Sequence, residues 1–275
     1  MATNRAPSQR LTVVMVVAAV AVVLAAVALY FSLTRDGGDD GAASGSSTAA
    51  TPVVPGLPPE TASSSPESTP GSPTTGFAYQ PLWPFAGVED AAAWQRAYRE
   101  GGHQPWRLDA ATIAVMFTQQ YLGYRNVDKA VTTDVRGEQA WVSVGFDNPG
   151  GRPAVAAVLH LARIGAGGDA PWEVVGSEDS TLTVTGPAYG STVRSPVVAS
   201  GRITGVDESL RVQLRRVDAA RPVGEVAGIA AGGTDSPWQA TVPFTAACPG
   251  TLTLAVSTGG HIAEVERFAV TGVWC

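Results

Sequence analysis

An uncharged apolar run near the N-terminus limits how this chain can fold. Residues 11–33 read LTVVMVVAAVAVVLAAVALYFSL. At ~1.5 Å per residue, a helix of about 23 residues is ~34 Å long, which is enough to cross the hydrocarbon core of a bilayer. The sequence therefore predicts a transmembrane anchor at 11–33, and only the chain beyond it is available for a folded domain.

Basic residues near the span predict its orientation. Arg5 and Arg10 precede it, whereas Arg35 alone follows it closely, so the segment 1–10 is expected on the cytoplasmic side. A cleaved signal peptide is the alternative, because Ala26-Val27-Ala28 fits a small-x-small cleavage site. In both cases the rest of the chain is exported, and we expect a single-pass protein of the cell membrane with extracytoplasmic C-terminal domains.

A linker is predicted over residues 34–76. This segment consists largely of Gly, Ser, Thr, Ala and Pro and contains no aromatic residue. It cannot bury enough apolar surface to offset the conformational entropy lost on folding. Aromatic residues begin at Phe77, so the folded part is expected to start there.

Charge and residue usage restrict the class of partner. The chain has 18 basic and 24 acidic residues and a formal net charge of −6. No basic stripe is present, which argues against nucleic acid as a partner. Lys129 is the single lysine among the basic residues, a usage typical of high-GC bacteria such as actinobacteria.

Residues 77–178 are predicted to form an α+β domain with two helices on a four-stranded antiparallel sheet. The first helix ends at Gly101 or Gly102, and the second starts at the N-cap Asp109 and ends at Gly123. Turn-rich segments separate the four expected strands, which are 128–135, 140–146, 154–164 and 172–176. This order of elements resembles nuclear-transport-factor-like folds, which implies a curved sheet around a cone-shaped pocket.

Residues 179–275 change to a period of two. Leu210, Val212 and Leu214 alternate with polar residues, and the segment 252–256 repeats the pattern. About seven short strands at a spacing of roughly 8 to 15 residues predict an all-β sandwich.

Turn residues and valines of this region carry a family resemblance. The positions are Thr185-Gly186-Pro187, Gly190, Val193, Ser195-Pro196-Val197, Gly201, Trp238-Gln239-Ala240-Thr241-Val242 and Gly250-Thr251-Leu252. This pattern resembles the bacterial immunoglobulin-like domain associated with spore-germination proteins of the GerM type. The resemblance implies an immunoglobulin-like sandwich on an exported, membrane-attached protein, an association with sporulation or germination, and no catalytic residues.

The cysteines of the chain, Cys248 and Cys275, allow one bridge. The midpoint between them falls in the loop STGGHIAE at 257–264. An antiparallel hairpin that turns there would place Cys248 opposite Cys275, within bridging distance. An exported chain tolerates such a disulfide; the alternative is two free thiols.

No catalytic motif is apparent. His103, His160 and His261 are scattered over a loop, a strand and a turn, so the sequence predicts that the protein is not an enzyme. His160 is expected as a sheet or core histidine. Core positions are also expected for Trp94, Trp106, Trp172 and Trp238, and a carbohydrate-stacking platform is the alternative for these tryptophans.

Acidic doublets suggest one metal site. In a sandwich, Glu178, Asp179, Asp207 and Glu208 would share one pole near the junction of the two domains. Converging carboxylates there could hold Ca²⁺, and solvated acidic loops are the alternative. No other cofactor is expected.

These patterns together predict a membrane-anchored, extracytoplasmic binding or structural protein of the bacterial envelope. Its partner would be an envelope protein or a cell-wall glycan. The alternative from another class is a small-molecule-binding or hydrolytic module that uses a pocket in the α+β domain.

Overall fold

The computed structural model describes residues 76–179 and 181–275, with side chains at all of these positions except 206–208. They belong to one compact unit, in which we call residues 76–179 the first lobe and residues 181–275 the second lobe. The expected anchor at 11–33, the segment 1–10 and the linker at 34–75 lie outside the described residues. None of the helices described is long and apolar enough to cross a membrane.

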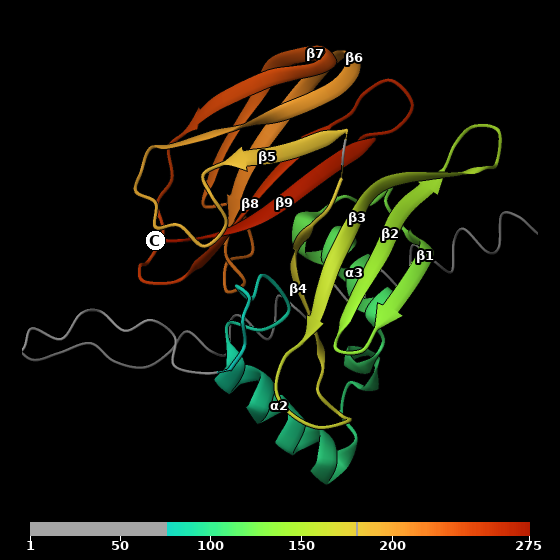
Figure 1. Ribbon diagram of the computed structural model, residues 1–275, viewed down its shortest axis with the longest axis vertical. Coiled ribbons are helices and arrows are strands. Elements are labelled where there is room, and N and C mark those ends of the chain that lie inside the picture. Colours follow the sequence, from blue (N-terminus) through green and yellow to red (C-terminus); the bar gives the residue numbers. More distant parts are fainter. Residues whose placement is uncertain (1–75, 180) are drawn as a thin grey trace, which may run out of the picture. The chain divides into compact units, whose positions relative to one another are not determined.

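An antiparallel meander forms the sheet of the first lobe, as the sequence predicted. Its strands follow each other in the order β1-β2-β3-β4 and lie side by side in Figure 1. Their bounds are β1 Lys129–Arg136, β2 Gln139–Asp147, β3 Pro153–Arg163 and β4 Trp172–Ser177. Gly137 and Gly151 turn the first two hairpins with φ of 62° and 72°, values that glycine adopts without steric cost.

Two helical segments precede the sheet. The first, α2 (Val88–Gly101), ends where Gly102 adopts φ 66° and its N–H donates to Tyr98 O at 2.7 Å. A 3₁₀ turn, η1 (Pro105–Leu108), leads to α3 (Ala110–Met116). The predicted cap of α3 is confirmed, because Asp109 Oδ1 accepts from Thr112 N at 2.7 Å.

The second helix differs from the expected regular α-helix in its last turns. Residues Phe117–Leu122 wind as a wider π-helical segment, η2, before Gly123 ends it with φ 82°. Thr118 Oγ1 lies 2.8 Å from the carbonyl oxygens of both Val115 and Val127. Its hydroxyl therefore links the helix to the chain that leaves it, and π-helical turns often mark such local departures.

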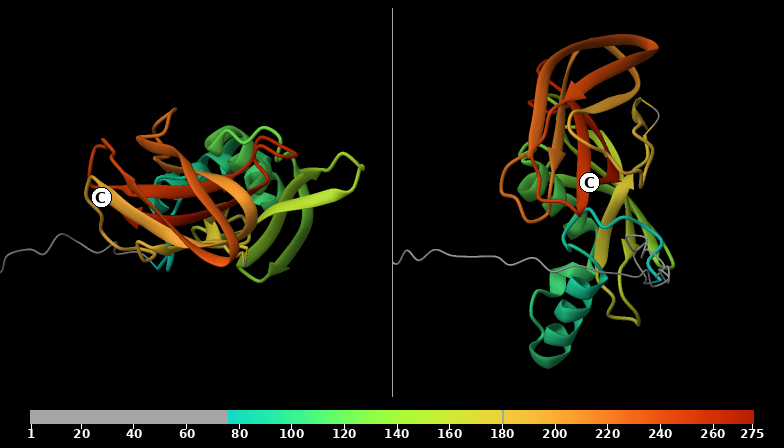
Figure 2. Two further views of the ribbon diagram at one scale, coloured as in Figure 1. Left: turned by 90° about the horizontal axis from the view of Figure 1, so that it is seen from above. Right: turned by 90° about the vertical axis from the view of Figure 1, so that its left-hand side faces the viewer.

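Only one of the helices covers the sheet. The core beneath the sheet contains residues of α3 and η2 such as Ile113, Phe117 and Tyr121. By contrast, α2 lies beyond one end of the sheet (Figures 1 and 2) and packs in a separate small cluster with Phe85 and Ile164. The expectation of two helices on one sheet face was therefore wrong for α2, and only the second expected helix, which comprises α3 and η2, covers the sheet.

The second lobe is a five-stranded antiparallel sheet with the path β5-β6-β8-β9, in which β7 pairs with β6. Its strands are β5 Leu182–Gly186, β6 Val197–Arg215, β7 Gly224–Val242, β8 Thr251–Thr258 and β9 Arg267–Trp274. Fewer strands are present than the predicted seven or so, because β6 and β7 are each 19 residues long and each replaces two expected strands. Both curve together in Figure 1.

Bulges explain how these long strands remain continuous. The β6–β7 register shifts on both sides of Gly205, opposite Gly233, and Gly233 has φ 113°. A bulge bends a strand without ending it, so one strand can contribute to two faces of the lobe. The sequence shows turn residues near 204–208 and 232–236. It does not show that these residues bend a continuous strand instead of interrupting it.

Strands β8 and β9 are buried on both faces. Leu254, Val256 and Val273 point into the core of the second lobe, whereas Phe268 and Val270 belong to the same cluster as the first-lobe core. All residues of β8 after the first are buried. A strand covered on one side only would leave alternate residues exposed, so this hairpin is the inner layer between the lobes.

Polar contacts across this layer are specific. Tyr121 Oη donates to Thr253 Oγ1 at 2.9 Å, and Arg215 Cζ lies 5.3 Å from the centre of the Tyr121 ring. Burial raises the pKa of Tyr121 to about 12, so its hydroxyl stays a donor. Nearby, Ser177 Oγ accepts from Val270 N at 2.8 Å.

The segment at the start of the first lobe, residues 80–83, acts as a strap, because it forms hydrogen bonds with both lobes. Leu82 N donates to Val174 O at 3.0 Å and Val174 N to Trp83 O at 2.8 Å, while Gln80 N donates to Tyr189 Oη of the second lobe at 2.6 Å. A Cβ at Gly272 would lie 2.9 Å from Leu82 Cδ2. Glycine at 272 therefore permits the close approach of this strap to β9.

The predicted disulfide is confirmed. Cys248 and Cys275 are bonded, with a Cα–Cα distance of 5.3 Å. The β8–β9 hairpin brings them together, because Thr251 is the register partner of Trp274 and Cys275 N donates to Gly250 O at 3.0 Å. The bond ties the end of β9 to the start of β8.

Removing this bond should destabilise the chain substantially. A loop with a sequence separation of 27 corresponds to roughly 3 to 4 kcal/mol in the chain-entropy description. We expect Cys275→Ser to lower the free energy of unfolding by about that amount in denaturant titrations of the oxidised protein. The double variant Cys248→Ser/Cys275→Ser is the control and should not respond to reductant. Equal unfolding midpoints for oxidised and reduced wild type would contradict the prediction.

Candidate binding groove

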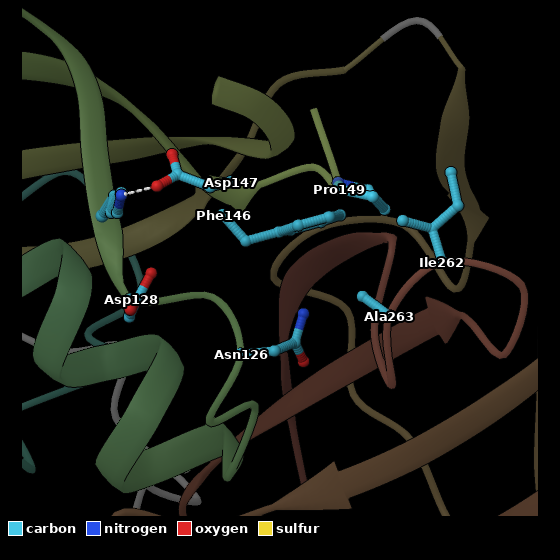
Figure 3. Close-up of a pocket in the computed structure, with 8 residues that line it drawn as sticks. Asn126, Asp128, Phe146, Asp147, Pro149, Ile262 and Ala263 are labelled. Atoms are coloured by element: carbon cyan, nitrogen blue, oxygen red, sulfur yellow. Dashed lines mark hydrogen bonds and ion pairs between the residues drawn. The ribbon is translucent and has the colours of Figure 1, made fainter. Parts of the chain in front are cut away.

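A groove lies where loops of the two lobes meet (Figure 3). We call it the junction groove, and its volume is about 450 Å³. Its lining residues are Asn126, Asp128, Lys129, Phe146, Asp147, Pro149, Ile262 and Ala263. The segment before β1 and the end of β2 supply one wall, and the β8–β9 loop supplies the other.

The second-lobe wall is held in place by hydrogen bonds. Asn126 Nδ2 donates to Val265 O at 2.7 Å, and Val265 N donates to Asn126 Oδ1 at 3.2 Å. Within the loop, Glu266 Oε1 accepts from the N–H groups of His261 and Ile262 at 2.8 and 2.5 Å. The loop is therefore pinned both to the first lobe and to itself.

Electrostatics agree with this arrangement. Burial raises the pKa of Glu266, but hydrogen bonds from the backbone of residues 261–263 outweigh it, so this pKa lies below the ordinary value. The carboxylate of Glu266 is thus the form that the loop stabilises.

The opposite wall carries charge. Lys129 Nζ pairs with Asp147 Oδ2, and this hydrogen bond raises the pKa of Lys129. Asp128 is exposed and forms no ion pair with a basic group in the part of the chain that the structure describes. The charge of Asp128 contributes to the raised pKa of Lys129, but among the described residues its carboxylate has no ion-pair partner of its own.

Apolar side chains complete the groove. The ring of Phe146 points across it toward Pro149, with Ile262 and Ala263 on the far side (Figure 3). Ile262 is 59% exposed. A ligand that combines a cation with an apolar group would match Asp128 and Phe146 on one side and Ile262 on the other.

A second cluster occupies the sheet face opposite α3. The His160 ring stacks on Trp141 at 4.9 Å with an interplanar angle of 5°, and Arg136 Cζ lies 5.0 Å from the Trp141 ring. Since β2 lies between β1 and β3, these neighbours cover the two faces of the indole. Tyr79 packs edge-on against His160 at 5.2 Å.

This cluster explains the role of His160. Its Nε2 lies 2.9 Å from Gln139 Oε1, and burial lowers its pKa while the charge of Glu178 opposes that change. The interpretation of His160 as a sheet histidine is therefore confirmed. Because both faces of Trp141 are occupied, the cluster offers no open stacking platform to a sugar.

The predicted core positions of the tryptophans are confirmed for three residues and wrong for one. Trp94, Trp172 and Trp238 are buried as expected, but Trp106 is 42% exposed, so the prediction of a core position was wrong for this residue. Trp106 lies in the short 3₁₀ turn η1, none of whose residues is buried. His103 and His261 are both exposed.

The predicted calcium ligands come from two segments, since Glu178 and Asp179 follow β4 at the end of the first lobe and Asp207 and Glu208 belong to β6. Asp179 Oδ1 accepts from both Thr181 N and Thr181 Oγ1 at 2.6 Å, and Glu178 is exposed. Asp207 and Glu208 lie in the bend of β6, where their side chains are outside the described set. No group of three or more metal-ligating side chains occurs among the described residues, and the calcium site stays a prediction.

Glu173 is a buried acid that the sequence analysis did not single out. It is completely buried on β4, where Oε2 accepts from Phe85 N at 3.1 Å and Oε1 has no partner among the described residues. Burial raises the pKa of Glu173 well above its ordinary value, against hydrogen bonds from Phe85 and Trp83 and the charge of Arg107. The sequence feature that could have revealed this buried acid is a glutamate at an inward-facing position of a strand whose other inward residues are apolar.

The groove itself was not predictable from local sequence. Asn126, Phe146 and Ile262 lie in or beside segments that the sequence analysis treated as turns. They come together only because the β8–β9 hairpin packs against the first lobe, which is a long-range arrangement. The one local signal was Ile262, an aliphatic residue within a glycine-containing loop.

Comparisons of the chain with known protein families, with curated proteins and with solved structures gave no match.

Glu173 makes stability depend on pH. The folded state keeps the proton between the ordinary pKa of 4.5 and the raised one, whereas the unfolded state releases it, so stability falls as pH rises through this interval. We expect Glu173→Gln to reduce that fall and to be more stable than wild type at alkaline pH, as measured by denaturation across pH. Glu138→Gln, at an exposed position, is the matched control. An unchanged pH profile for Glu173→Gln would refute the assignment.

Proposed function

We propose that this protein is a non-enzymatic binding protein of the bacterial envelope, anchored by residues 11–33, that presents the junction groove to a protein segment outside the membrane. The observation that carries the proposal is the groove itself, whose walls come from both lobes and are fixed by Asn126 and Glu266. Binding sites are commonly concave, preformed and located between packed units.

Export is supported by the disulfide. Bonds such as Cys248–Cys275 form and persist in oxidising compartments and are rare in the cytosol. This agrees with an anchor whose basic flank lies inside. The cleaved-signal alternative leads to the same compartment and differs only in whether the protein stays attached.

Strand pairing supports the immunoglobulin-like relationship. The first half of β6 pairs with β5 and with the second half of β7. The second half of β6 pairs with β8, and β8 in turn pairs with β9. Immunoglobulin-like sandwiches divide their strands in this way between an A-B-E sheet and a C-F-G sheet. In addition, Thr192 forms a parallel bridge with Trp274. The resemblance to the spore-germination-associated domain would place the protein among exported, membrane-attached modules.

The chemistry of the groove favours a protein partner over a glycan. Asp128 offers a carboxylate beside the Phe146 ring and the exposed Ile262, which suits a Lys or Arg side chain next to an apolar residue. A neutral sugar would use neither the charge nor the apolar wall fully. The indole of Trp141, which could have stacked on a sugar, is covered by His160 and Arg136.

The alternative of a pocket enclosed by the first-lobe sheet has less support. Side chains of the sheet face toward α3, such as Val142, Val144 and Leu159, are fully buried in a continuous core. A cone-shaped cavity would need space at these positions. The packing at these positions therefore gives the rival function less support than the junction groove gives the first.

Site-specific photo-cross-linking in intact cells tests the proposal. A photoreactive amino acid at Ile262 should give a discrete cross-linked protein, whereas the same group at Val198, which is 51% exposed on β6, should not. Asp128→Lys should reduce the product at least tenfold, because it places a like charge against the basic partner. Identical products from positions 262 and 198, or products that ignore Asp128→Lys, would contradict it.

A further inference from the structure

A second cavity lies in the first lobe, away from the junction groove. It has a volume of about 610 Å³ and is formed by α2, the end of β3 and the loop that follows β3. We call it the arginine pocket, and its lining residues are Gly76, Phe77, Val88, Ala92, Gln95, Arg96, Arg99, Arg163, Gly165 and Ala166. Nothing in the proposed function depends on it.

The arginines of this pocket differ in how they are paired. Arg99 is neutralised, because its Nε and Nη2 contact the Asp169 carboxylate at 2.5 and 2.7 Å. Arg96 on α2 makes no ion pair with any carboxylate that the structure describes. Among the described residues, one guanidinium that lines the cavity therefore has no carboxylate partner within ion-pair distance.

Arg163 faces the cavity from the β3 side and is held in position. Its Cζ lies 4.5 Å from the centre of the Trp172 ring, and Nη1 donates to Ala170 O. Its closest carboxylate is that of Glu138 at 4.0 Å, a residue whose side chain is 77% exposed. Because the Arg163–Glu138 contact is long and Glu138 is solvated, most of the charge of Arg163 can still act on a ligand in the cavity.

The wall between these arginines is rigid. The Gln95 side chain is buried, and its Nε2 donates to Ala166 O at 3.1 Å and to Asp169 Oδ1 at 3.3 Å. Gly165 has φ 109°, and a Cβ there would lie 2.4 Å from Gln95 Oε1. The Gln95 amide therefore holds the loop after β3 against α2.

Apolar groups form the remaining wall. Phe77, Val88 and Ala92 line the same cavity as Arg96 and Arg163. Guanidinium groups bind carboxylates and phosphates through paired N–H donors. The pocket thus combines oxyanion donors on two elements with a surface that excludes water from an aliphatic chain.

We infer that the arginine pocket binds an oxyanion, a carboxylate or a phosphate monoester, on a short apolar body, with Arg96 and Arg163 contacting the oxyanion. With a net charge of −6, the chain as a whole does not attract anions, so binding depends on these local donors. The ligand is either a free small molecule or a carboxylate of the chain that precedes Gly76, where Glu60 and Glu67 are the nearest acidic residues in sequence.

Calorimetric titration of the full chain in nanodiscs, with empty nanodiscs subtracted, tests the inference. The probes are butyrate and butyl phosphate, with butan-1-ol as the uncharged control. We expect saturable binding of at least one anion and none of the alcohol. Arg96→Gln should weaken binding at least fivefold, since it removes a charge without removing a described structural contact.

A matched pair of helix variants separates the pocket from general effects. Ala92→Glu places a carboxylate four residues before Arg96 on the same helix face, inside the pocket, and should abolish binding. Ala93→Glu, at an exposed neighbouring position, should leave binding unchanged. Equal losses in both variants, or no saturable binding of either anion by both the wild type and Glu60→Gln/Glu67→Gln, would overturn the inference.

The source of the oxyanion is distinguished in the same assay. If the wild type binds neither probe but Glu60→Gln/Glu67→Gln does, the pocket holds the carboxylate of its own linker, and the inferred chemistry stands. If that variant also fails to bind, the inference is wrong. Binding by the wild type identifies a free small molecule as the ligand class.

Discussion

The structure depends on a hairpin that is buried on both sides. One face of β8 and β9 packs into the core of the second lobe through Leu254 and Val273. The other face places Phe268 and Val270 in the first-lobe core. Because successive side chains point to opposite faces, the residues on both faces of β8 and β9 remove apolar area from water. The hairpin therefore links the stability of both lobes, and the disulfide at its open end restrains the same element.

Local chemistry made much of the fold predictable. The cap at Asp109, the glycine that ends each helix and the turn-rich segments between the first-lobe strands each act over a few residues, so their elements were expected at nearly the observed positions. The Cys248–Cys275 bond followed from the hairpin register. Long-range packing was not predictable in the same way: the curvature of β6 and β7, the position of α2 and the second buried face of β8 depend on contacts between distant segments.

The two candidate sites show the same division. Asp128 and Ile262 are separated by more than a hundred residues and meet only because β9 packs against the first lobe. Arg96 and Arg163 meet because Gln95 fixes the loop after β3 against α2. The junction groove is acidic and apolar, whereas the arginine pocket is basic and apolar. The ligands that they select therefore differ in charge, and occupation of one does not require the other.

Hydrogen exchange of Phe268→Ala most directly tests whether β8 and β9 stabilise both lobes. Removing this buried ring should cost about 3 to 5 kcal/mol. Our account predicts that amides of β2 and β3 in the first lobe lose protection by the same amount as those of β6 and β8, while Val198→Ala at an exposed site changes neither. Loss of protection confined to the second lobe, with β2 and β3 unchanged, would contradict it.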